Sequence, residues 1–189
     1  MIHRMILAGS GGQGLLTLGK LLAQCGMEAG HHVTYFPSYG AEVRGGTAHC
    51  HVVMSDDEIY SPLVEDATAL LLMNQPSLER FGGQLERGGL LVLNSSMAEL
   101  DGPLRGKRVL EVPASEIARR LGSVRVANMV MLGALNGALG LVKSERVLSA
   151  LAERLVGKAE ALMPLNEKAL AAGEELAGEA VSGRRGCSS

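Results

Sequence analysis

The residues best suited to chemistry lie in a glycine-rich segment near the N-terminus, residues 9–14, which reads Gly-Ser-Gly-Gly-Gln-Gly. The segment fits the pattern G-x-G-x-x-G between an apolar run and an amphipathic stretch, so it is expected to join a strand to a helix. In that setting Gly9 permits a tight turn, Gly11 lets another group approach the backbone, and Gly14 lets the helix pack on the sheet. Unpaired amides at the start of the helix favour an anion. The candidate residues for an anionic ligand or a subunit contact are Gly9, Gly11, Gly12, Gln13 and Gly14.

The glycine segment alone permits three interpretations. A site for NAD or FAD normally has an acidic residue at the end of the second strand, which holds the ribose hydroxyls. Here that strand is expected to end with Tyr35-Phe36-Pro37-Ser38, without an acid. The glycines can also serve only to turn the chain and pack the helix. The third interpretation is contact with a partner chain or with an anionic ligand shared between chains.

A second unusual segment, residues 38–46, combines glycines, an acid, a base and an aromatic residue between two apolar runs. Loops of this composition often carry function. In a parallel sheet the ends of the first and second strands lie side by side at the carboxyl edge, so we expect Gln13, Tyr39, Glu42 and Arg44 to converge there. A simple surface ion pair of Glu42 with Arg44 is the alternative. The residues we expect at an interface or near a ligand are Ser38, Tyr39, Glu42, Arg44, Gly45, Gly46 and, after a later strand, Asn74.

Other reactive side chains give weaker signals. His49 and His51 share one face of a predicted strand, but no third metal ligand follows at a recognisable spacing, so we expect a structural role and no metal site. The cysteines, Cys25, Cys50 and Cys187, form no C-x-x-C pair, which argues against a disulfide framework, a zinc site or an iron–sulfur cluster. No arrangement suggests a hydrolytic triad, and we assign no catalytic residue to this chain.

Strands and helices alternate along the sequence, which predicts an α/β fold: a three-layer α/β/α sandwich with a mostly parallel but mixed, Rossmann-like sheet and a helical C-terminal part. A βαβ unit is expected to open the chain. The expected strands are residues 1–8, 32–35, 47–54, 68–73, 90–93 and 108–112, with 58–60 as a returning hairpin strand. The expected helices are residues 15–29, 77–87 and 114–121, one that begins near 128, and then 143–156 and 164–177. In the helix that begins near 128, small residues would let a neighbouring helix approach closely: Gly133, Ala134, Gly137 and Ala138.

Length and composition suggest one domain, residues 1–181, followed by a flexible tail, residues 182–189, which is rich in Gly, Arg and Ser. A net charge of -2 without a basic stripe argues against nucleic acid as a partner. The N-terminal residues leave no room for a signal peptide, and no apolar stretch is long enough for a membrane span. We therefore expect a cytoplasmic protein.

Four segments together resemble the gamma subunit, or gamma domain, of 2-oxoacid:ferredoxin oxidoreductases. They are residues 9–14, residues 38–46, Ser55-Asp56-Asp57-Glu58-Ile59 and Met73-Asn74-Gln75, in that order and spacing. The match is strong in the first half of the chain and loose in the helical second half. The loop after the second strand looks most like the 2-oxoglutarate and 2-oxoisovalerate types. Many members of those types have proline where this chain has Ala41.

The resemblance implies an enzyme that decarboxylates a 2-oxoacid on thiamine diphosphate, passes electrons through iron–sulfur clusters to ferredoxin, and forms an acyl-coenzyme A. This chain has no thiamine diphosphate motif and no cysteine cluster. The resemblance therefore implies that thiamine diphosphate, magnesium and the clusters lie on alpha, beta and, where present, delta subunits, with coenzyme A as co-substrate. We expect the isolated chain to be inactive, and 2-oxoglutarate to be the oxoacid.

Two other functions remain open at this stage. One is a self-sufficient Rossmann-type oxidoreductase that binds NAD or FAD at residues 9–14. The other is a pure assembly module whose glycine segment contacts only protein. The missing acid after the second strand, and the lack of a plausible catalytic base beside the glycine segment, count against the first of these.

Overall fold

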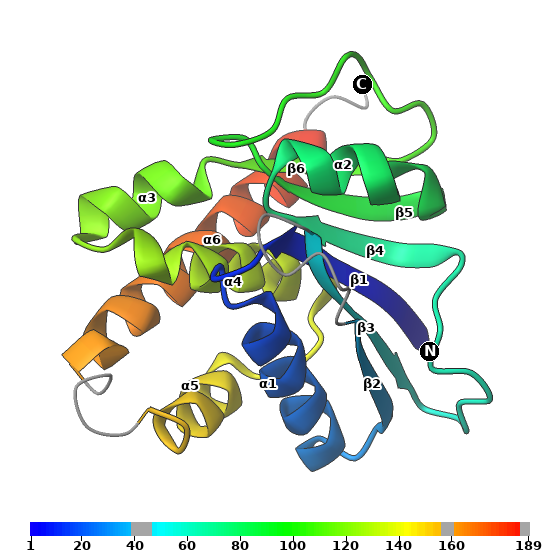
Figure 1. The fold of residues 1–189 in the computed structure, drawn as a ribbon, viewed down its shortest axis with the longest axis horizontal. Helices are drawn as coiled ribbons and strands as arrows, with labels where there is room; N and C mark the ends of the chain where they lie inside the picture. Colours follow the sequence, from blue (N-terminus) through cyan, green and yellow to red (C-terminus); the bar gives the residue numbers. More distant parts are fainter. Residues whose placement is uncertain (39–46, 156–160, 186–189) are drawn as a thin grey trace.

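The computed structural model describes residues 1–38, 47–155 and 161–185. Within these ranges six strands form one sheet in the order β2-β3-β1-β4-β5-β6 (Figure 1). The strands are β1 (Ile2–Ser10), β2 (His32–Ser38), β3 (Thr47–Ser55), β4 (Ala67–Leu72), β5 (Leu85–Asn94) and β6 (Arg108–Val112).

Helices connect the strands and make up the C-terminal part. The α-helices are α1 (Leu15–Glu28), α2 (Gln75–Phe81), α3 (Ala114–Leu121), α4 (Ala127–Leu139), α5 (Ser144–Ala152) and α6 (Met163–Arg185). Two short 3₁₀ helices, η1 (Gly82–Gln84) and η2 (Val124–Val126), precede β5 and α4. Because no helix in the described ranges is both long and apolar enough, none can cross a membrane.

Strand pairing makes the sheet mixed, as predicted. β1, β4, β5 and β6 run parallel to one another, whereas β3 is antiparallel to both of its neighbours, β1 and β2. β1 and β2 therefore run in the same direction but are separated by β3. The expectation that their carboxyl ends lie side by side is wrong, because β3 occupies the position beside β1.

Alternating side chains on the strands supply two apolar cores. Met5 and Leu7 face the core formed with α1, α3, α4, α5 and α6. Ile6 and Ala8 face a smaller core on the other side, which is covered by α2 and by the segments that follow β3 and β5. This arrangement is the predicted three-layer α/β/α fold (Figure 1).

Three predicted elements differ from the structure. Residues 58–60 form no strand, because β3 is already paired on both edges, and Ile59 packs on the smaller core instead. The helix predicted over residues 77–87 ends at Phe81, because Gly82 and Gly83 are poor helix formers. α6 continues past the predicted end at residue 177 to Arg185, and so extends into the segment we expected to be a tail. Residues 186–189 lie outside the described ranges.

Close packing of α4 on α6 agrees with the small residues noted in the sequence. A β-carbon added to Gly133 would lie 2.0 Å from the backbone oxygen of Leu170, and one added to Gly173 would lie 2.0 Å from that of Val130. The helices therefore touch backbone to backbone. Asn136 joins them further along, since its Nδ2 donates to Glu174 Oε1 at 3.1 Å.

Candidate functional site

The glycine segment is positioned by β1 and α1, but its glycines do different work from that predicted. β1 continues to Ser10, so Gly9 lies in the strand, where a β-carbon would meet Gln13 Oε1 at 2.5 Å. Gly9 thus leaves room for the Gln13 side chain and does not form the turn. The positive φ angles fall at Gly12 (89°) and Gly14 (76°), while Gly11 faces open space.

Gln13 braces this loop from within. Its Oε1 accepts a hydrogen bond from the backbone N–H of Ser10 at 2.7 Å, and its backbone N–H donates to Ser10 O at 3.2 Å. Its Nε2 points to Met97 Sδ at 3.7 Å. The Gln13 side chain is therefore part of the loop's own framework.

The N-terminus of α1 is open to a ligand. Gly14 is the N-cap residue and offers no side-chain hydrogen bond, and no acidic residue lies in the first turn. The first amides of the helix are thus left to another acceptor. Since a helix N-terminus carries a partial positive charge, an anion is the acceptor it favours.

Buried amides hold the neighbouring strand ends together. Asn74, 6% exposed, donates from Nδ2 to Ser10 Oγ at 2.6 Å and caps α2 by accepting from the Ser77 backbone N–H at 3.0 Å. Asn94 donates to Ser115 Oγ at 3.0 Å. The ends of β1, β4 and β5 and the start of α3 are therefore fixed relative to the glycine loop.

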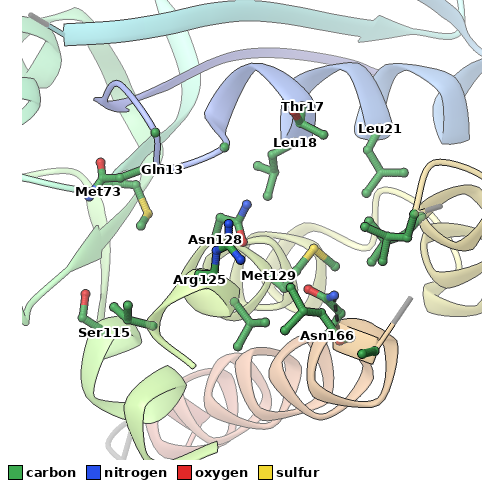
Figure 2. A pocket seen from close by; sticks show the side chains of 18 of the residues that line it. Gln13, Thr17, Leu18, Leu21, Met73, Ser115, Arg125, Asn128, Met129 and Asn166 are labelled. Atoms are coloured by element: carbon green, nitrogen blue, oxygen red, sulfur yellow. Dashed lines mark hydrogen bonds between the residues drawn. The ribbon is translucent and has the colours of Figure 1, made fainter. Parts of the chain in front are cut away.

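A cavity of about 730 Å³ opens beside this loop, between α1 and the C-terminal helices (Figure 2). Its size is in the range of sites for cofactors and other small molecules. The residues that line it are Gly12, Gln13, Gly14, Thr17, Leu18, Leu21, Met73, Met97, Ser115, Val124, Arg125, Val126, Asn128, Met129, Leu151, Leu155, Ala161, Leu162 and Asn166.

The charge of the cavity suits an anion. Arg125, at the η2 turn, is the one charged residue among the lining residues that the structure describes. Within the described ranges neither Arg125 nor Asn128 makes a side-chain hydrogen bond or ion pair, so both have donors to offer. Asn128 reaches the start of α1, since a β-carbon on Gly14 would lie 2.6 Å from its Nδ2.

The predicted site residues separate into three groups. Gly12, Gln13 and Gly14 line the cavity, whereas Gly9 and Gly11 do not. Asn74 is tethered to Ser10 beside the cavity, and its hydrogen bonds stay within the chain. Ser38 pairs with His49 at the end of β2, one strand removed from β1. Tyr39, Glu42, Arg44, Gly45 and Gly46 lie outside the described residues, so their role at an interface stays a prediction.

The polar lining residues that were not predicted include Arg125, Asn128 and Asn166. They come from η2, α4 and α6, far along the chain from the glycine loop. The available signal was a polar pair, Arg125 and Asn128, at the start of an otherwise apolar helical stretch. Recognising it as part of the site requires knowing that α4 packs near the N-terminus of α1.

The fold also bears on the dinucleotide interpretation. In a Rossmann site the acid that binds the ribose lies on the strand next to the glycine-bearing strand. Here β3 lies next to β1 on that side, and no acidic residue is among the described residues that line the cavity. The geometry of a usual NAD or FAD site is therefore missing from the described part of the chain.

The histidines on β3 have structural surroundings. The rings of His49 and His51 lie 5.7 Å apart on the predicted shared face, and His51 Nδ1 accepts from the Val64 backbone N–H at 2.9 Å. Burial lowers the pKa of both side chains, and His49 lowers the pKa of His51 further. No group of three or more potential metal ligands occurs among the residues the structure describes.

This burial predicts a loss of stability in mild acid. Because the folded-state pKa of His51 is below its unfolded value of about 6.5, the unfolded chain takes up a proton first, and the free energy of unfolding falls as pH drops through that value. Protonation would also turn Nδ1 from an acceptor into a donor facing the Val64 N–H. Urea unfolding at pH 7.5, 6.5 and 5.5 should show a shallower fall for His51→Gln than for the wild type. Equal slopes would contradict this assignment.

The described cysteines are buried thiols. Burial raises the pKa of Cys25 to about 11 and that of Cys50 to about 12, so both are protonated near neutral pH. Neither offers the thiolate that a cluster or a nucleophile requires. Cys187 lies outside the described residues.

The fold and the cavity define a three-layer α/β domain with an anion-compatible pocket at the start of its first helix. The family model described as pyruvate ferredoxin/flavodoxin oxidoreductase matches residues 4–176, and the chain belongs to this family. Within the family it corresponds to the gamma subunit, as its resemblance to known gamma subunits indicates.

Two curated relatives come from Methanothermobacter thermautotrophicus. Ketoisovalerate oxidoreductase subunit VorA is 41% identical over 95% of this chain and 37% of its own length. The chain thus spans just over a third of the first curated relatives it matches. 2-Oxoglutarate synthase subunit KorC is 38% identical over 72% of this chain and 76% of its own length.

The fold of a solved gamma subunit is similar to that of this chain and supports the family assignment. The gamma subunit of a keto/oxoacid ferredoxin oxidoreductase from Geobacter sulfurreducens is 29% identical, with a TM-score of 0.79 over 94% of this chain and 99% of that subunit. The resemblance first seen in the glycine segment therefore extends over nearly the whole chain.

Proposed function

We propose that this chain is the gamma subunit of a multi-subunit 2-oxoacid:ferredoxin oxidoreductase and supplies part of the site for coenzyme A. The complex oxidatively decarboxylates a 2-oxoacid, transfers the acyl group to coenzyme A and reduces ferredoxin in the cytoplasm. The observation that supports the coenzyme A site is the cavity, which combines the open N-terminus of α1 with Arg125 and has no acidic lining residue among those described.

The residues present fit the phosphates of coenzyme A. Amides at the start of α1 donate to phosphate oxygens, and the planar guanidinium of Arg125 offers paired donors for the same groups. Asn128 Nδ2, close to Gly14, adds a neutral donor. The apolar remainder of the cavity is suited to the less polar parts of an elongated ligand.

Thiamine diphosphate, magnesium and iron–sulfur clusters belong to the partner subunits in this proposal. The described residues offer no metal-ligand group and only buried, protonated cysteines, so we derive no step through these cofactors on this chain. The alpha, beta and any delta subunits are then the partners, with ferredoxin as electron acceptor. Residues 38–46 and Asn74 are proposed to lie toward those subunits.

Two oxoacids are candidates for the substrate. The loop sequence resembles both the 2-oxoglutarate and the 2-oxoisovalerate types, and 2-oxoglutarate is the oxoacid expected from the sequence. 2-Oxoisovalerate gains support because a relative named as a ketoisovalerate oxidoreductase subunit matches 95% of this chain, against 72% for a 2-oxoglutarate synthase subunit.

The proposal is tested by anaerobic purification of the tagged chain from its native host, followed by an assay of viologen reduction. We expect copurifying subunits, the brown colour of iron–sulfur clusters, and activity that requires coenzyme A together with one of the two oxoacids. A colourless, inactive protein without partners, under conditions that preserve a known enzyme of this family, would contradict the proposal.

A further inference from the structure

The two ends of the cavity differ in chemistry. At the glycine-loop end lie Gln13 and Ser115, with Arg125 and Asn128 between the ends (Figure 2). At the other end the wall is formed by leucines of α1 and α5 together with the start of α6. In Figure 2 Asn166 lies at this end, on the opposite side of the cavity from Gln13. A ligand that spans both ends is therefore elongated, with its charge toward Arg125 and the glycine loop and its apolar part toward α6.

Asn166 is the polar exception in this apolar end. Its side chain is 7% exposed and lines the cavity. Its Nδ2 donates to the backbone oxygen of Leu162, one turn earlier in the chain, at 2.9 Å. Its Oδ1 accepts no hydrogen bond from any residue that the structure describes. One acceptor is thus held in place at the cavity wall, without a donor among the described residues.

An acceptor at this position selects its ligand. A ligand that fills this end of the cavity separates Asn166 Oδ1 from water, so a ligand group with an N–H donor binds better here than a purely apolar group, which would leave the acceptor unpaired. The leucines nearby, such as Leu21 and Leu151, favour a flat or aliphatic group around that donor. The hydrogen bond from Nδ2 to Leu162 O fixes the amide so that Oδ1 is presented to the cavity.

We propose that the end of the cavity between α1, α5 and α6 is a specificity subsite, in which Asn166 Oδ1 accepts a hydrogen bond from an N–H group on the apolar portion of an elongated anion. This inference rests on the proposed coenzyme A site and adds the orientation of the ligand: phosphates toward Arg125 and the glycine loop, the N–H-bearing portion toward α6. Coenzyme A has two such portions, the adenine amino group and the amides of its pantetheine arm.

Isothermal titration calorimetry with the full chain can show which of these N–H groups, the adenine amine or a pantetheine amide, binds Asn166. The ligands are coenzyme A, adenosine 3′,5′-bisphosphate, and pyrophosphate as a probe of the anion end alone. Asn166→Leu removes the acceptor at similar volume and is expected to weaken coenzyme A by about tenfold, the usual loss for one hydrogen bond. An equal loss for the bisphosphate assigns the adenine amine, whereas a loss for coenzyme A alone assigns a pantetheine amide. Pyrophosphate should bind unchanged, which also controls for folding.

Asn166→Ser is the second variant in case leucine disturbs α6, because a serine hydroxyl can bond the Leu162 carbonyl but is too short to reach the ligand. Unchanged coenzyme A affinity in a folded variant would overturn the subsite while leaving the proposed function intact. If the wild type binds neither coenzyme A nor pyrophosphate, in isolation or in the purified complex, the coenzyme A site itself fails and the subsite with it.

Discussion

Gly173→Ala is expected to destabilise the protein by about 3 kcal/mol or more, the upper part of the range for overpacked cores. The added methyl group would lie 2.0 Å from the backbone oxygen of Val130 and 2.6 Å from the backbone nitrogen of Ala134. Flexible side chains can move aside, but backbone atoms within α4 cannot do so without separating the two helices. The loss should appear as a lower urea midpoint by circular dichroism.

The matched control is Gly178→Ala in the same helix. A β-carbon there meets nothing within 4 Å, and the position is exposed. Alanine should therefore stabilise α6 slightly, by about 0.5–1 kcal/mol through helix propensity. If Gly173→Ala were as stable as Gly178→Ala, the backbone contact between α4 and α6 would not exist in solution.

This contact illustrates what the sequence alone could predict. The small residues from Gly133 to Ala138 indicated that a helix approaches closely, because only small side chains permit it. The partner, α6, could not be identified, since periodicity gives the buried face of a helix but not the element packed against it. The need for glycine at position 173 becomes evident only once α4 and α6 are known to be neighbours.

The sheet was predictable in its class and in most of its strands, but not in its order. Apolar runs gave most strand positions within three residues, although β5 begins at Leu85 and not at residue 90. Nothing local to residues 47–54 indicated that they insert between β1 and β2. Pairing order depends on competition among all strands for the same edges. As a result, the expectation that the carboxyl ends of β1 and β2 lie side by side was wrong.

The candidate site, like the sheet, was predictable only in part. The type and spacing of the glycines singled out Gly12, Gln13 and Gly14, which line the cavity, and their role in binding stays a prediction. Which glycine turns the chain was misassigned, because the pattern does not state where β1 ends. Arg125 and Asn128 were missed, since a single arginine carries no signal until the fold brings it opposite the helix N-terminus.

Arg125→Ala is expected to raise the apparent KM for coenzyme A by about 30-fold in the assembled enzyme, with little change in kcat at saturation. The magnitude corresponds to one lost charge-assisted interaction of about 2 kcal/mol. The reason is that Arg125 supplies the one side-chain cation among the described lining residues, and no described residue engages its guanidinium. Arg125→Lys keeps the charge but loses the paired donors, so its KM for coenzyme A should lie between those of the wild type and Arg125→Ala.

Arg119→Ala is the matched control, because it removes the same charge from an exposed position on α3 that does not line the cavity. Initial rates with a viologen acceptor at varied coenzyme A give the comparison, and thermal unfolding of each complex checks assembly. A rise in KM that occurs equally in both variants would indicate a general electrostatic effect. An unchanged KM in Arg125→Ala would mean that the anion of the ligand binds elsewhere, and that the open N-terminus of α1 faces protein instead.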